Sequence, residues 1–122
     1  MTMRNTVLIV TSMLACGSAQ AAEKFLDGAY GNEIGCIFAR TGEYASAGMF
    51  ELLNDEGILT DNTTCEFRGR ATKKPFGFSH PIRCRSEEEI GAVETVDLLR
   101  SPQGYTVRFK DGIEWGPMPK CH

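Results

Sequence analysis

The sequence has few of the residues that metal sites and catalytic centres use most often. It contains two histidines in 122 residues, and its five cysteines never stand in a CxxC spacing. Zinc ligands usually recur at such short spacings, so a zinc site is poorly supported. No nucleophile-elbow motif supports a serine hydrolase either. We therefore predict no cofactor, no metal site and no enzymatic activity.

Long apolar runs are missing from most of the chain, so we predict no transmembrane segment. Near the start, Arg4 precedes an apolar run over residues 7–15 that is too short to cross a bilayer as a helix. The small-x-small sequence at 19–21 then resembles a cleavage site. This pattern predicts a secretory signal peptide over 1–21, a single mature domain over 22–122, and a periplasmic or secreted protein.

Cys16 leaves a second interpretation of the N-terminus open. It follows Met13-Leu14-Ala15, as the acylated cysteine of a lipoprotein follows a related triplet. The protein would then be anchored to the cell envelope through lipid on Cys16. Because bacterial lipoprotein sites usually carry Leu where Met13 stands, we favour the signal peptide.

Four cysteines remain in the mature chain, and an exported chain of this length typically pairs them in two disulfides. Cys65 and Cys84 lie symmetrically about Lys74-Pro75, which predicts a β-hairpin with Cys65 opposite Cys84. The second disulfide is then Cys36–Cys121 by elimination. No free thiolate nucleophile would remain.

The hairpin register sorts side chains by polarity, because residues alternate between the two faces of a strand. One face carries both sulfurs, and on it Phe67 lies opposite Ile82. The same register, extended toward the turn, places Gly69 opposite His80 and makes His80 a core residue. On this face Ala71 also pairs with Phe78. The pairs on the polar face are Thr64 with Arg85, Glu66 with Arg83, Arg68 with Pro81 and Arg70 with Ser79.

The rest of the chain also predicts strands. A register across the turn at 101–104 pairs Leu98 with Val107 and Asp97 with Arg108. Trp115 would lie either across from Arg108 or over Phe109, and the proline-rich residues 116–119 should end the last strand. The expected strands cover 25–31, 34–39, 49–53 (with a helix as the alternative), 58–60, 93–100, 105–110 and 113–115. The predicted fold is all-β: an antiparallel meander curled into a small barrel or sandwich, with two disulfides.

Basic residues gather on the predicted hairpin. Residues 65–85 hold six basic residues and one acidic residue, a balance of +5, whereas the rest of the mature chain holds six basic and 15 acidic residues, a balance of −9. The hairpin could therefore attract an anionic protein or envelope component. An alternative is that the cations protect an open sheet edge. We do not expect nucleic acid as a partner. The candidate binding residues are Arg68, Arg70, Lys73, Lys74, Arg83 and Arg85.

A loose family resemblance accompanies these patterns. Gly28-x-Tyr30 before Cys36, Gly57-Ile58 before Cys65-x-Phe67, Cys84-x-Ser86-Glu87 and a closing Cys121 resemble small four-cysteine proteins exported by proteobacteria, a family without a known function. The architecture is similar to that of periplasmic lysozyme inhibitors and lipocalin-like metalloprotease inhibitors. The resemblance implies an inhibitor but assigns no site.

We therefore hypothesise an exported, non-enzymatic binding module, with a periplasmic inhibitor of a hydrolase such as lysozyme or a protease as its specific form. A cell-envelope structural protein or lipoprotein is the alternative. A more distant alternative is a small hydrolase that uses Asp55, Glu56 or His80. The oligomeric state stays open.

Overall fold

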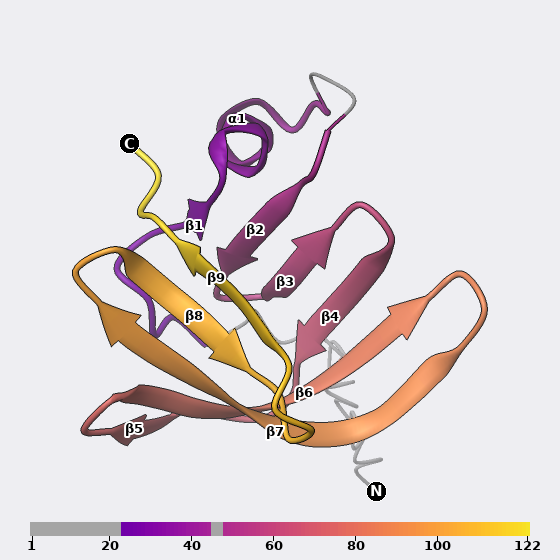
Figure 1. The fold of residues 1–122 in the computed structure, drawn as a ribbon, viewed down its shortest axis with the longest axis vertical. Helices are drawn as coiled ribbons and strands as arrows, with labels where there is room; N and C mark the ends of the chain where they lie inside the picture. The colour runs from indigo at the N-terminus through magenta and orange to yellow at the C-terminus, as the bar shows by residue number, and fades with distance from the viewer. Residues whose placement is uncertain (1–22, 45–47) are drawn as a thin grey trace, which may run out of the picture.

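The computed structural model describes residues 23–44 and 48–122, which form one antiparallel sheet and one helix (Figure 1). The predicted signal peptide and Cys16 lie outside these residues. In the part that is described, no helix is long and apolar enough to cross a membrane. The elements are β1 (Tyr30–Gly31), α1 (Glu33–Thr41), β2 (Glu51–Asn54), β3 (Gly57–Thr60), β4 (Thr63–Phe67), β5 (Thr72–Lys74), β6 (Gly77–Ser86), β7 (Ile90–Ser101), β8 (Gly104–Arg108) and β9 (Glu114–Met118).

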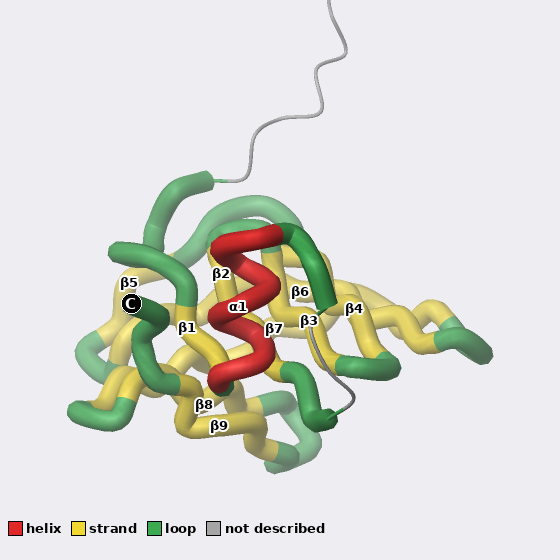
Figure 2. Tube along the Cα trace, turned by 90° about the horizontal axis from the view of Figure 1, so that it is seen from above, coloured by secondary structure: helices red, strands yellow, loops and turns green. Residues whose placement is uncertain are grey.

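The strands form a meander that curls back on itself. Their order is β1-β2-β3-β4-β6-β7-β8-β9, with β5 paired to β6. The chain after β9 returns to β1, where the amide of Gly31 donates to the carbonyl of Pro119 and the amide of Cys121 donates to that of Ala29, both at 2.8 Å. The sheet is therefore a nearly closed barrel, which confirms the predicted all-β fold (Figures 1 and 2).

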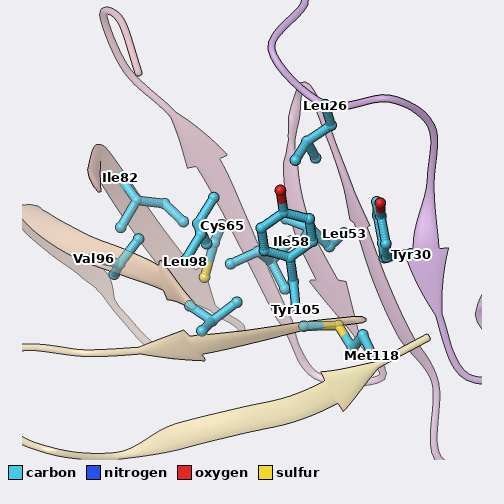
Figure 3. Close-up of a cluster of buried hydrophobic side chains, with 11 residues drawn as sticks. Leu26, Tyr30, Leu53, Ile58, Cys65, Ile82, Val96, Leu98, Tyr105 and Met118 are labelled. Atoms are coloured by element: carbon cyan, nitrogen blue, oxygen red, sulfur yellow. The ribbon is translucent and has the colours of Figure 1, made fainter. Parts of the chain in front are cut away.

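The core fills the inner face of this barrel (Figure 3). Alternate residues of each strand point inward, so β7 contributes Val96 and Leu98, and both are fully buried. Apart from the phenols of Tyr30 and Tyr105, His80 is the one buried polar side chain in the described ranges. The other side chains that are at most 1% exposed are Leu53, Ile58, Cys65, Ile82, Val107 and Met118.

The disulfide-linked hairpin confirms the predicted register only as far as Phe67. Cys65 pairs with Cys84 and is bonded to it, and Phe67 pairs with Ile82. The predicted pairing of Gly69 with His80, and of Ala71 with Phe78, is wrong because the chain leaves the sheet opposite Pro81 and returns only at β5. There Lys73 pairs with Phe78, two residues out of the expected register.

Helix α1 replaces the strand expected at 34–39. The side chain of Asn32 accepts the amide of Gly35 at 2.8 Å and caps the first turn. Gly42, with φ +73°, ends the helix, and its amide donates to the carbonyl of Phe38. Figure 2 shows α1 beside β1 and β2. Cys36 of this helix forms the predicted disulfide with Cys121. The strand expected at 25–31 is reduced to β1, whereas the strands expected at 49–53 and 58–60 are confirmed as β2 and β3.

The C-terminal hairpins follow the prediction in part. Leu98 pairs with Val107 as expected. Trp115 lies across from Val107, so neither proposed register is correct, although its ring does contact Phe109 edge-on at a centroid distance of 4.5 Å. Strand β9 also continues through Pro117 to the buried Met118. A register shift between Tyr105 and Val107 accommodates Gly116 and Pro117, the first two of the four residues that were expected to end the strand.

Candidate functional site

Three of the six predicted basic residues meet on the outer face of the barrel. Arg68, Arg83 and Arg85 line a small groove of about 120 Å³ together with Glu66 and Ile90. Glu66 lies opposite Arg83 in the register, so both side chains share the face that points away from the core. We call this set of five residues the arginine groove.

Within residues 23–44 and 48–122, one of the groove's three arginines is neutralised by a carboxylate. Arg85 forms an ion pair with Glu66 at 3.2 Å. The guanidinium Nε of Arg83 donates to the carbonyl of Gly91 at 3.2 Å, which fixes its side chain without cancelling its charge. Arg68 is exposed. The groove therefore keeps an excess of positive charge that can act on a partner over about a Debye length.

The other three predicted residues lie apart from the groove. Arg70 approaches Glu23 at 3.9 Å, and its side chain is almost fully exposed. Lys73 and Lys74 are exposed on β5, which pairs with β6 and with no other strand in the described part of the chain. The position of these two lysines matches the alternative role, protection of a strand edge.

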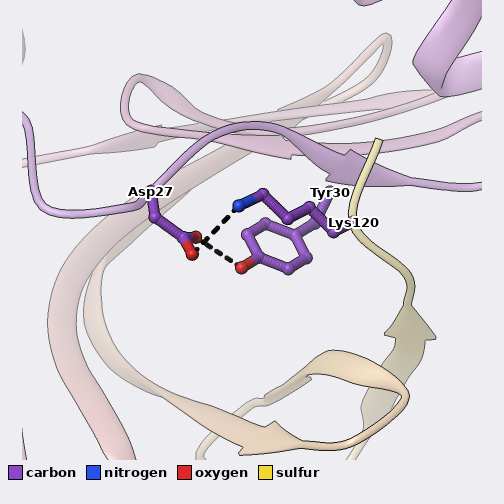
Figure 4. A network of polar contacts seen from close by, with 3 residues as sticks. All are labelled: Asp27, Tyr30 and Lys120. Atoms are coloured by element: carbon purple, nitrogen blue, oxygen red, sulfur yellow. Dashed lines mark hydrogen bonds and ion pairs between the residues drawn. The ribbon is translucent and has the colours of Figure 1, made fainter. Parts of the chain in front are cut away.

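A second site, at one end of the barrel, was not predicted. Asp27, Tyr30, Arg100, Tyr105 and Lys120 belong to the lining of a pocket of about 590 Å³, which we call the barrel mouth. The Tyr30 hydroxyl donates to Oδ1 of Asp27, and the Lys120 ammonium bonds to Oδ2 at 3.1 Å (Figure 4). The turn between β7 and β8 and the residues Pro119 and His122 complete the lining.

The barrel mouth holds its tyrosines in the neutral form. Burial, followed by the hydrogen bond to Asp27, raises the pKa of Tyr30 to about 12. The same hydrogen bond, followed by the one from Lys120, lowers the pKa of Asp27. Burial also raises the pKa of Tyr105, whose ring meets Tyr30 edge-on at 4.8 Å. At neutral pH the lining of the mouth therefore includes an ionised carboxylate, a lysine paired with it and two neutral phenols that are almost fully buried.

The residues of the hydrolase hypothesis have separate positions in the fold. His80 is 1% exposed and stacks on Phe67 at a centroid distance of 4.3 Å, which confirms it as a core residue. Asp55 accepts the backbone amides of Phe25 at 2.9 Å and Leu26 at 2.8 Å, so it fixes the segment before β1. Glu56 is exposed in the β2–β3 turn. Among the described residues, no hydrogen bond joins any two of these three side chains.

The buried histidine makes stability depend on pH. Burial lowers the pKa of His80 below its usual value, so the unfolded chain binds a proton that the folded chain excludes. The full stability should be present above about pH 6.5, and should fall below it by up to about 1.4 kcal/mol per pH unit. Urea unfolding between about pH 7 and pH 5 measures this loss. His80→Phe keeps an aromatic ring and should remove the slope; equal slopes in both proteins would contradict the assignment.

The two sites differ in shape and in the origin of their residues. The arginine groove is small and is built by neighbouring strands on the outer face, whereas the barrel mouth is larger and joins residues from both ends of the sheet. Both carry arginines that are free to meet an anionic group.

Comparisons of the chain with protein-family profiles, curated proteins and solved structures give no match.

Proposed function

We propose that this protein is an exported, non-enzymatic binding protein that docks an acidic protein surface on its arginine groove. An inhibitor of a hydrolase such as lysozyme or a protease is the specific form of this proposal. The two disulfides are compatible with an oxidising compartment outside the cytoplasm.

The observation that carries the proposal is the placement of exposed aliphatic side chains beside the arginines. In the register of β6 and β7, Arg83 lies opposite Val93 and Arg85 lies opposite Ile90. Ile90 is 64% exposed and Val93 is 54% exposed. Arginine is enriched at protein interfaces and provides much of their binding energy, and the aliphatic side chains beside it add area that is buried on docking.

The surface is also held rigidly. The Cys65–Cys84 disulfide joins β4 to β6 directly beneath it. Arg83 is fixed to Gly91 of β7, so β4, β6 and β7 present one pre-formed surface. Such pre-organisation lowers the entropic cost of binding. Glycoside hydrolases carry paired carboxylates in their active-site clefts, which gives the arginines a complementary target.

A charge-reversal pair tests this proposal. Arg68→Glu with Arg85→Glu should weaken capture of the partner from a periplasmic extract, and inhibition of lysozyme or a protease, by about tenfold or more. Both side chains are exposed, so the fold should tolerate the change. The control is Lys73→Glu with Lys74→Glu, which makes the same change in net charge on the neighbouring strand β5.

The control should retain binding to within about threefold, because Lys73 and Lys74 do not line the groove. Equal losses in the two variants would show a diffuse charge effect and would remove the groove from the proposal. A wild-type protein that captures no partner and inhibits neither class of enzyme would overturn the binding function itself.

A further inference from the structure

The barrel mouth contains an arginine on the inward-facing side of its strand. Val96 and Leu98 of β7 point into the core and are fully buried. Arg100 is the next alternate position of β7 after Val96 and Leu98. Its partner in the register, Tyr105, is 3% exposed and also faces inward. The side chain of Arg100 therefore belongs to the inner face of the sheet, at the point where the barrel opens.

This arginine is the unbalanced charge of the barrel mouth. Lys120 lies on the same face as Tyr30, through the bridge between these two residues, and its ammonium is paired with Asp27. Arg100 forms no ion pair within residues 23–44 and 48–122. Its charge acts on both phenols, lowering the pKa of Tyr30 and of Tyr105 against the larger effect of burial. One uncompensated cation therefore stands at the opening, next to two neutral phenols.

We propose that the barrel mouth binds a small ligand through a carboxylate or phosphate group held by the guanidinium of Arg100. Guanidinium donates two parallel hydrogen bonds to such planar or tetrahedral oxyanions, which an ammonium group cannot do. The body of the ligand lies against the exposed Pro102 and Pro119, which also line the pocket. The pocket volume of about 590 Å³ lies within the range usual for small-molecule sites.

The fold gives the site its selectivity for anions of limited charge. Asp27 already neutralises Lys120, so Arg100 alone recruits the ligand, and the carboxylate of Asp27 repels a second anionic group. Removing that carboxylate frees the lysine for the ligand. Asp27→Asn should therefore tighten oxyanion binding, whereas loss of Arg100 should weaken it.

Calorimetric titration of the whole protein with three probes tests the site. The probes are N-acetyl-trialanine with a free carboxylate, its C-terminal amide, and phenyl phosphate. We expect the free carboxylate, phenyl phosphate or both to bind about tenfold or more tightly than the amide. The two anionic probes decide which oxyanion the mouth prefers. Amide shifts in an NMR titration should centre on Gly104 and Tyr105.

Variants then separate the site from general charge effects. Arg100→Gln should weaken binding of the preferred anion by about tenfold or more, and Arg100→Lys should restore only part of it. The matched control is Arg108→Gln: Arg108 lies on β8, pairs with Glu114 and is exposed. That variant should bind to within about twofold of the wild type.

Two results would overturn this proposal. One is that neither anion binds at about 10 mM, where even a weak site would be occupied. The other is binding that is equally strong without Arg100. Neither result bears on the arginine groove, which is on the outer face and is tested by capture of a protein.

Discussion

Replacing Cys36 and Cys121 together by alanine is expected to lower the free energy of unfolding by about 4.5 kcal/mol. The two cysteines are 85 residues apart, so the disulfide closes most of the described residues into a loop and restricts the unfolded state strongly. The Cys65–Cys84 disulfide closes a loop of 19 residues, and its loss should cost about 3 kcal/mol.

The position of Cys121 adds a second reason for a large loss. The residues around it close the barrel, through the hydrogen bonds from Gly31 to Pro119 and from Cys121 to Ala29. Without the disulfide, the polar contacts that hold the chain after β9 among the described residues are these bonds, the ion pair of Lys120 and a hydrogen bond from Arg40 to the carbonyl of His122. Opening there would also expose Met118, which is fully buried.

Chemical denaturation of the two double variants measures both effects. Each pair of cysteines is removed completely, so no free thiol remains to form a wrong disulfide. The Cys36/Cys121 variant should show the lower midpoint, together with increased amide exchange at Gly31. A smaller loss than in the Cys65/Cys84 variant would contradict the assigned role of the C-terminal segment in closing the barrel.

The sequence predicts those strands in which polar and apolar residues alternate over a few positions. The pairing of Cys65 with Cys84 follows from symmetry about a turn combined with the separation of polar and apolar faces. The same register placed Arg83 and Glu66 on one outer face, so part of the arginine groove was visible without a structure. The predicted register is wrong after Phe67, because the chain leaves the sheet opposite Pro81 and pairs again only at β5. The alternation of polar and apolar residues does not show where such an interruption occurs.

Helix α1 was not predicted because the apolar run at 34–39 is too short to show the 3.6-residue period of a helix. A run of this length is equally typical of a short buried strand. Its end signals are present, since Asn32 and Gly42 are residues typical of an N-cap and of a left-handed C-terminus. The barrel mouth left no comparable signal. Asp27 and Lys120 are 93 residues apart, and only closure of the barrel brings them together.

Gly57→Ala is the single substitution from which we expect the largest loss, about 3–5 kcal/mol. Gly57 has φ +155°, a conformation that residues with a Cβ rarely adopt. A Cβ at this position would also overlap the carbonyl oxygen of Cys65 on the adjacent strand. Because Cys65 is bonded to Cys84, that strand cannot easily move away.

Gly112→Ala provides the matched control for this prediction. Gly112 has φ +94°, but a Cβ there would meet no atom within 4 Å. Its loss, about 1–2 kcal/mol, therefore measures the backbone conformation alone. The difference between the two variants in urea unfolding gives the cost of the close approach of β3 to β4. Equal losses would contradict the prediction. They would mean that β3 and β4 can separate to admit a side chain at Gly57 although the disulfide holds β4.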